Sequence, residues 1–168
     1  ESDACTKQQT IDVRSLILEG MEWYVGCNFR VRDQTRGKVL VQAAVQHESL
    51  CAVAVSLYYG WGGRSKDEIR AFEYFQMCLS GECDVIAQLH IGYCYSNGLG
   101  PQVTQNKMQA TKYYKTAAEQ GNSEAQYRLG NDAHYAFVNY GKDLEFISEA
   151  LKWWTRAAEQ GHSSARFS

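Results

Sequence analysis

Two residues of this 168-residue chain stand at a spacing that could support thiol or metal chemistry. His90 and Cys94 lie four positions apart, so on a helix they share one face and could pair a thiolate with an imidazole or supply two metal ligands. No third ligand or orienting group lies near them in the sequence, and a nucleophile also needs an oxyanion site. A structural cysteine beside a surface histidine is therefore the favoured interpretation. A thiol enzyme that uses Cys94 and His90 is kept as the weakest functional alternative.

Cys51 and Cys78 form a second pair with chemical potential. They lie at nearly equal distances from a turn expected near residue 64, so two antiparallel helices would bring them face to face, either as a disulfide or as two buried thiols.

Six cysteines are many for a chain of this size, and the chain begins at Glu1 rather than Met, which suggests a processed or recombinant piece. We therefore expect a periplasmic or secreted location rather than a cytoplasmic one.

Glycine-rich stretches at 60–63 and 98–100 resemble phosphate-binding loops only superficially. Both are expected between two helices rather than after a strand, and no Lys-Ser or Lys-Thr follows them, so they are interpreted as turns. His47, His134 and His162 fall near expected helix ends or on a surface, and are interpreted as surface or cap residues. The sequence predicts no cofactor and no metal site.

The elements that must position these residues come from an internal repeat. Residues 110–125 return as residues 150–165, with nine of sixteen positions identical. Self-similarity at this spacing is typical of stacked helical hairpins, in which each unit buries its apolar face against the next. One proline, 11 tyrosines, four tryptophans and 14 glycines agree with helices that aromatic residues pack and glycine turns separate. The predicted fold is an all-α solenoid.

The clearest unit spans 84–121. Ala87, Ile91 and Tyr95 recur at helical spacing and mark a first helix, and the turn at 98–101 reverses the chain. A second helix is expected to start near Thr104 and to end at Gly121. The same template predicts a single solenoid domain over 1–168, with units at about 11–48, 49–83, 84–121 and 122–161, and the start of a fifth helix at 162–168.

The pattern Ala-x3-Leu-Gly-x2-Tyr-x2-Gly-x-Gly, followed after a spacer by Ala-x2-Tyr-Tyr-x2-Ala-Ala-x2-Gly-x3-Ala, resembles the Sel1-like repeat, a relative of the tetratricopeptide repeat. The positions that carry the resemblance are Gly92, Tyr95, Gly98, Gly100, Ala117, Ala118 and Gly121. It implies an adaptor that binds other proteins on a curved helical surface without catalysis.

The resemblance also implies which residues face a partner, because the first helix of each hairpin lines the concave side in such arrays. The positions carried over are Leu57, Trp61, Tyr93, Asn97, Tyr127, Asn131, His134 and Tyr135. Aromatic side chains there would combine large contact area with a polar group. The alternative is that the aliphatic positions, such as Leu57, only pack between neighbouring helices, because an apolar stripe at helical spacing is usually core.

The charge and hydropathy of the sequence limit the kinds of partner that the chain could bind. With 17 Lys and Arg against 19 Asp and Glu the formal net charge is −2, which does not favour nucleic acid. No apolar stretch reaches the ~20 residues that cross a bilayer, so no membrane insertion is expected. We therefore expect a protein or peptide as the partner of a non-catalytic scaffold. A periplasmic inhibitor or immunity protein that neutralises a toxin or effector is the alternative.

Overall fold

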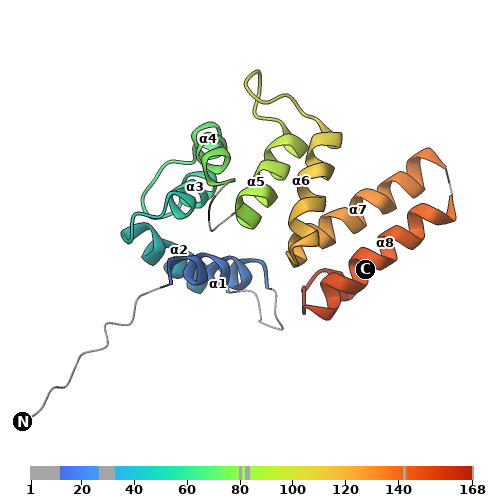
Figure 1. The fold of residues 1–168 in the computed structure, drawn as a ribbon, viewed down its shortest axis with the longest axis horizontal. Helices are drawn as coiled ribbons and strands as arrows, with labels where there is room; N and C mark the ends of the chain where they lie inside the picture. The colour runs from blue at the N-terminus through green and yellow to red at the C-terminus, as the bar shows by residue number, and fades with distance from the viewer. Residues whose placement is uncertain (1–11, 27–32, 80, 82–83, 142, 168) are drawn as a thin grey trace, which may run out of the picture.

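The computed structural model describes residues 12–26, 33–79, 81, 84–141 and 143–167, and within these ranges it contains eight α-helices and no strand. The all-α prediction is confirmed. The helices, shown in Figure 1, are α1 (Val13–Val25), α2 (Gln34–Gln46), α3 (Leu50–Tyr59), α4 (Glu68–Cys78), α5 (Asp84–Asn97), α6 (Lys107–Glu119), α7 (Ser123–Tyr140) and α8 (Leu144–Glu159).

Most of these helices begin at a short polar side chain that accepts a hydrogen bond from a free backbone N–H of the first turn. The caps are Asp12, Asp33, Ser49, Asp67, Asn106, Asn122 and Asp143. The prediction that the helix of residues 107–119 starts near Thr104, as its N-cap, is wrong by two residues, because the N-cap of α6 is Asn106. The chain first returns to α5, where the Asn106 backbone N–H donates to the Tyr95 carbonyl at 2.8 Å, and only then does the Asn106 side chain cap α6.

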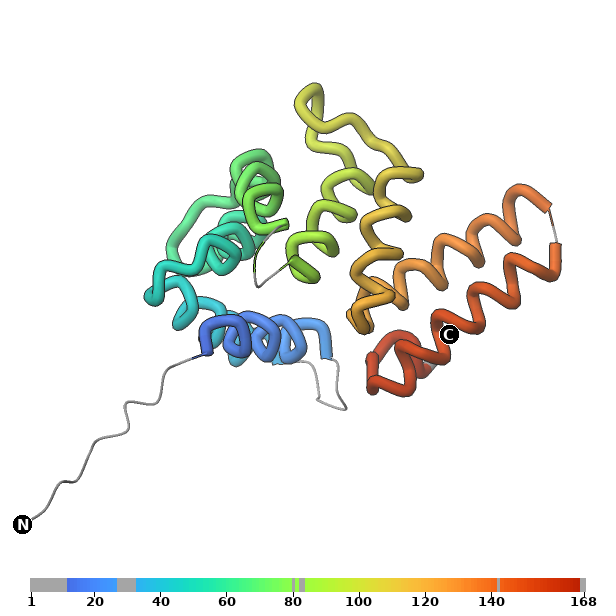
Figure 2. The backbone as a smooth tube through the Cα atoms, in the orientation of Figure 1, coloured from blue at the N-terminus to red at the C-terminus, as the bar shows by residue number. Residues whose placement is uncertain are grey.

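Consecutive helices pair into four antiparallel hairpins, α1–α2, α3–α4, α5–α6 and α7–α8, which stack into a strongly curved array (Figure 1 and Figure 2). The curvature brings the two ends of the array together. The Ser163 backbone N–H donates to the Gly26 carbonyl at 3.1 Å, and the Ser163 hydroxyl donates to the Val25 carbonyl at 3.3 Å. Where the sequence suggests the start of a fifth helix, the structure has a 3₁₀ helix, Ala165–Phe167, beside these contacts.

Close helix approach inside the first hairpin depends on two glycines that face each other, Gly20 of α1 and Gly37 of α2. A methyl group at Gly37 would lie 2.5 Å from the Gly20 carbonyl oxygen and 3.0 Å from the Tyr24 backbone nitrogen. Both atoms belong to the backbone of α1, so relief requires the whole helix to move. The close packing of α1 against α2 therefore requires glycine at position 37.

We expect Gly37→Ala to lower the free energy of unfolding by about 2 kcal/mol, as measured by urea denaturation. The steric cost of overpacking, up to ~3 kcal/mol, exceeds the ~1 kcal/mol gain in helix propensity from glycine to alanine. Gly81→Ala is the matched control, because its new methyl group would meet only the Cys78 carbonyl oxygen at 3.6 Å, an ordinary contact. Equal stabilities of the two variants would show that α1 and α2 separate at little cost.

Candidate functional site

A cavity of about 350 Å³ opens on the inner side of the curved array, and we call it the tyrosine cavity. Its walls come from α1, α3, α5, α6 and α7 and from the segment after α8, so it exists only when all four hairpins are stacked. Its lining residues are Tyr24, Val25, Tyr58, Tyr59, Tyr93, Ser96, Asn97, Tyr114, Glu124, Tyr127, Arg128 and Ser164.

The tyrosine rings hold one another in place across the helices. Tyr93 of α5 stacks on Tyr58 of α3 with ring centroids 6.4 Å apart, and meets Tyr114 of α6 edge-on at 5.8 Å. Tyr24 of α1 packs against Tyr59 at 5.0 Å. Burial raises the pKa of Tyr59 and of Tyr93 well above the usual range, so their hydroxyls stay neutral. The cavity wall is therefore a preorganised surface of aromatic faces and neutral hydroxyls.

Glu124, in the first turn of α7, joins three separate parts of the chain at the cavity. Its carboxylate accepts hydrogen bonds from the Tyr93 hydroxyl, Arg128 Nε and His162 Nε2, each at 2.8 Å. Burial by itself would raise the pKa of Glu124, but the His162 hydrogen bond and the Arg128 charge outweigh it and hold this pKa at about 2. The residue is therefore an anion at any physiological pH, and it ties α5 and α7 to the segment that closes the array.

His162 is buried, with 1% of its surface exposed, which corrects the interpretation of this residue as lying on the surface. It does act at a helix start, because its Nδ1 accepts a hydrogen bond from the Ala165 N–H at 3.3 Å. That bond leaves the ring proton on Nε2, which donates to Glu124. The ring also stacks on Tyr127 at 4.7 Å, and this packing together with Glu124 accounts for its burial.

Arg128 is the cationic side chain in the described lining of the cavity. Of its three guanidinium nitrogens, only Nε has a hydrogen-bond partner among the described residues. Its Nε is bound to Glu124, and its guanidinium lies over the Tyr93 ring, 5.0 Å from the ring centroid. The side chain remains 46% exposed. In the part of the chain that the structure describes, its two terminal amino groups have no hydrogen-bond partner, so they are available to a ligand in the cavity.

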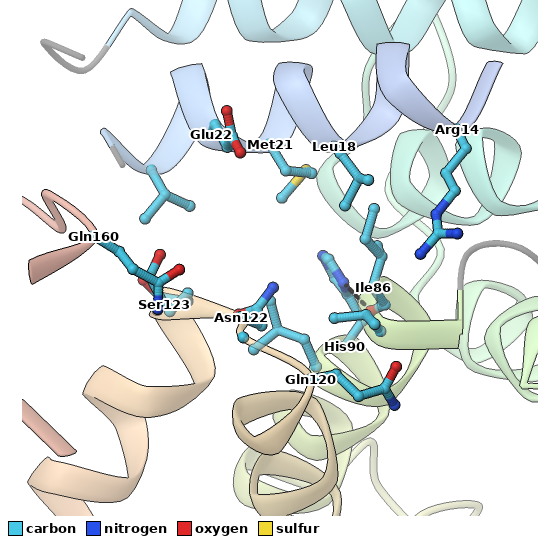
Figure 3. A pocket seen from close by; sticks show the side chains of 15 residues that line it. Arg14, Leu18, Met21, Glu22, Ile86, His90, Gln120, Asn122, Ser123 and Gln160 are labelled. Carbon is cyan, nitrogen blue, oxygen red and sulfur yellow. Dashed lines mark hydrogen bonds between the residues drawn. The ribbon is translucent and has the colours of Figure 1, made fainter. Parts of the chain in front are cut away.

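A second cavity, of about 190 Å³, lies between α1, α5 and the turn that joins α6 to α7. Leu18 and Met21 of α1 point toward Ile86 and His90 of α5 across it (Figure 3). His90 donates from Nδ1 to the Ile86 carbonyl at 2.8 Å, whereas its buried Nε2 has no hydrogen-bond partner among the residues that the structure describes. Burial lowers the pKa of His90 to about 4, against the opposing effects of that hydrogen bond and the Glu124 charge, so the ring is neutral at pH 7.

Three of the residues expected to face a partner, Tyr93, Asn97 and Tyr127, meet in the tyrosine cavity. Leu57 and Trp61 are instead core residues, 6% and 7% exposed, and the expectation that they face a partner is corrected. Leu57 packs between helices, which is the alternative that the sequence left open. Trp61 follows the left-handed Gly60, which turns it back onto Tyr59, with ring centroids 4.6 Å apart.

The remaining predicted site residues lie farther along α7 and do not line the cavity. Asn131 accepts a hydrogen bond from Trp154 Nε1 of α8 at 3.1 Å, and the His134 ring packs against the same tryptophan at 5.4 Å. Tyr135 is half-exposed, and Lys107 lies over its ring at 4.2 Å. The predicted surface is thus divided between the cavity and a separate stretch of α7.

His90 and Cys94 do not form the pair that thiol chemistry requires. Both are buried, which corrects the expectation of a surface histidine. His90 Nδ1 donates to the Ile86 carbonyl and Nε2 has no hydrogen-bond partner among the described residues, so neither nitrogen bonds to the Cys94 sulfur. Burial also raises the pKa of the Cys94 thiol to about 12, so the nucleophilic thiolate is scarce at neutral pH. Cys51 and Cys78 are likewise buried, and no disulfide joins these two residues.

Sequence reasoning missed four of the six tyrosines of the cavity wall and both of its charged residues. Tyr24, Tyr58, Tyr59 and Tyr114 look like ordinary core aromatics, because a repeat pattern does not separate inner surface from core. A signal for Glu124 did exist: the two matching copies agree at Ser123 and Ser163, and Glu124 then stands where the second copy has Ser164. The departure from the repeat thus occurs at Glu124, the residue whose carboxylate accepts three hydrogen bonds.

The described residues contain no cluster of three or more His, Cys, Asp or Glu that could hold a metal ion. Among the same residues, no helix is both long and apolar enough to span a bilayer. Stacked helix-turn-helix units around an inner cavity define an α-solenoid repeat protein.

The chain belongs to the Sel1 repeat family. The family profile, described as Sel1 repeat, matches residues 47–77, 85–122 and 123–162, which together make up well over half of the chain. Sel1 repeat proteins are generally protein–protein interaction scaffolds. The resemblance suggested by the sequence is confirmed.

Two curated relatives share part of this sequence. The sel1-like repeat-containing protein L21 of Acanthamoeba polyphaga mimivirus is 35% identical over 68 residues, which are 40% of this chain and 12% of that protein. DAP3-binding cell death enhancer 1 of Rattus norvegicus is 41% identical over 63 residues, which are 38% of this chain and 12% of the relative. The matched region thus spans only a small part of these relatives.

Solved structures share the fold over nearly the whole chain. The protective antigen c5321 of uropathogenic Escherichia coli, described as displaying an SLR fold, superposes with a TM-score of 0.57 at 24% identity and covers 93% of this chain and 32% of the antigen. A Sel1 repeat protein from Oxalobacter formigenes superposes with a TM-score of 0.56 at 22% identity and covers 92% of this chain and 61% of its own. At this identity the likeness shows the fold alone.

Proposed function

We propose that this chain is a non-catalytic scaffold that binds an extended segment of another protein in the tyrosine cavity. The observation that carries the proposal is the convergence of six tyrosines from five helices on one open cavity of about 350 Å³. Tyrosine is favoured at binding surfaces because it offers a large contact area and a polar hydroxyl at a small cost in side-chain entropy. A cavity whose walls are already packed loses little further entropy when a ligand enters.

A related protein supports the partner class. DAP3-binding cell death enhancer 1 is named for binding another protein, and it shares 41% identity with part of this chain. The alternative of a thiol enzyme lacks a site, because Cys94 and His90 are buried and do not contact each other through a hydrogen bond. Binding, rather than chemistry, is the role that the cavity suits.

A blocking substitution at the rim of the cavity tests the proposal. Asn97 is exposed and lines the tyrosine cavity, so Asn97→Trp should fill the opening. Peptides would be selected on the wild-type chain from a random library displayed with free C-termini, and their Kd values measured by fluorescence polarisation. We expect Asn97→Trp to weaken binding at least ~10-fold, because a buried anchor contributes on the order of 2 kcal/mol or more.

The matched control is Gln76→Trp, which adds the same side chain at an exposed position of α4 that lies outside both cavities. Its peptide affinities should equal those of the wild type, and both variants should keep the wild-type melting curve. If every selected peptide bound Asn97→Trp as tightly as the wild type, the cavity would not be the binding site.

A further inference from the structure

We propose that the tyrosine cavity recognises a carboxylate on the bound segment, either its C-terminal carboxylate or an Asp or Glu side chain, and that Arg128 is the residue that binds it. This inference rests on the proposed function and adds the chemistry of the group that is recognised. It depends on how Arg128 is held and on the charges around it.

The geometry of Arg128 leaves its ligand-binding edge open. Glu124 accepts only from Nε, at 2.8 Å, so the edge formed by the two terminal amino groups has no partner among the described residues. Those two groups present parallel N–H donors in one plane, which matches the two oxygens of a carboxylate. The cavity therefore contains a fork of donors that lacks only an acceptor.

The side chain is also preorganised for binding. Its Nε is anchored to a carboxylate that is itself fixed by Tyr93 and His162, and its guanidinium lies over the Tyr93 ring at 5.0 Å. An unanchored arginine would lose considerable rotamer freedom on binding a ligand, whereas Arg128 has already lost it. A ligand that reaches the terminal amino groups thus gains the charge-assisted hydrogen bonds at reduced entropic cost.

The surrounding charges select a singly charged anion. Arg128 is the only Lys or Arg in the described lining of the cavity, and Glu124 contributes one fixed negative charge beside it. A carboxylate carries one charge and can share the guanidinium with Glu124, with one partner on each edge. A phosphate dianion would meet the Glu124 charge with no second cation to offset it. Neutral groups would leave the fork without a charged acceptor.

The test uses the N97W-sensitive peptides selected above, each made in three forms. The first form has its natural free C-terminus, the second has an amidated C-terminus, and the third has every Asp and Glu replaced by Asn and Gln. The Kd of each form is measured on the wild type, Arg128→Gln and Arg128→Lys. Because each peptide carries its own neutral counterpart, a double-mutant cycle separates the contact with Arg128 from any change in the fold.

We expect one of the two neutral forms to bind the wild type ~10- to 100-fold more weakly, as the loss of a charge-assisted bidentate contact implies. Sensitivity to amidation identifies a C-terminal carboxylate, and sensitivity to side-chain replacement identifies Asp or Glu. On Arg128→Gln the charged and neutral forms should differ by less than ~2-fold. Arg128→Lys keeps the charge without the planar fork, so it should show an intermediate difference. If Arg128→Gln fails to fold, Arg128→Lys carries the same comparison.

Two results overturn the inference. If peptides that require the open cavity bind equally well without any carboxylate, Arg128 does not recognise a carboxylate. The proposed function would remain intact. If a fourth form, in which phosphoserine replaces an Asp or Glu of the peptide, binds more tightly than the carboxylate form, the cavity selects a different anion. A library that yields no peptide sensitive to Asn97→Trp would instead contradict the proposed function itself.

Discussion

Replacing Glu124 with alanine is expected to lower the free energy of unfolding by about 3 to 5 kcal/mol, the range typical when one partner of a buried charged network is removed. The substitution leaves the Tyr93 hydroxyl, Arg128 Nε and His162 Nε2 without their shared acceptor. His162 is almost fully buried, so water cannot readily replace the lost oxygen. Urea denaturation of the wild type and the variant at pH 7 measures the effect.

The control for this experiment is Glu145→Ala. Glu145 also lies in the first turn of a helix, α8, so both glutamates interact with the positive end of a helix dipole. Glu145 is exposed, and its loss should cost less than about 1 kcal/mol. A similarly small loss in Glu124→Ala would mean that the three hydrogen bonds of Glu124 contribute little beyond that dipole interaction. The proposal that Glu124 holds Arg128 in place would then lose its energetic support.

The hairpins could be predicted from the sequence because their signals are local. Ala87, Ile91 and Tyr95 repeat at helical spacing, and the glycines at 98 and 100 adopt the positive φ angles of a chain reversal, 73° and 75°. The N-cap at Asn106 rather than at Thr104 was missed, because its position depends on a contact with α5 that no local pattern records. Element type thus follows from periodicity, whereas boundaries follow from tertiary contacts.

The candidate site was less predictable because it depends on how strongly the array curves. Tyr93, Asn97 and Tyr127 were found by their place on the inner helices, but inner position alone does not distinguish Leu57, a core residue, from Tyr93. The closing contact joins Ser163 to Val25 across 138 positions of sequence. That contact arises from small rotations accumulated over four hairpins, and no single repeat encodes it.

Acid is expected to destabilise this protein in two separate pH windows, each set by one buried group. His90 has a pKa near 4 in the fold against about 6.5 when unfolded, so its contribution is fully present above pH 6.5 and is lost as the pH falls toward 4. Glu124 has a pKa near 2 against about 4.5 when unfolded, so its contribution is present above pH 4.5 and is lost toward pH 2. Each window corresponds to about 3 kcal/mol.

Single substitutions should remove one window at a time. His90→Asn can keep a donor to the Ile86 carbonyl but cannot titrate, so its free energy of unfolding should change by about 3 kcal/mol less than that of the wild type between pH 7 and pH 4. Glu124→Gln should show the corresponding difference only between pH 5 and pH 2. The comparison uses changes with pH rather than absolute stabilities, so a lower starting stability of either variant does not affect it. Parallel pH profiles of His90→Asn and the wild type would mean that His90 can take up a proton within the fold, with water reaching Nε2 through the second cavity.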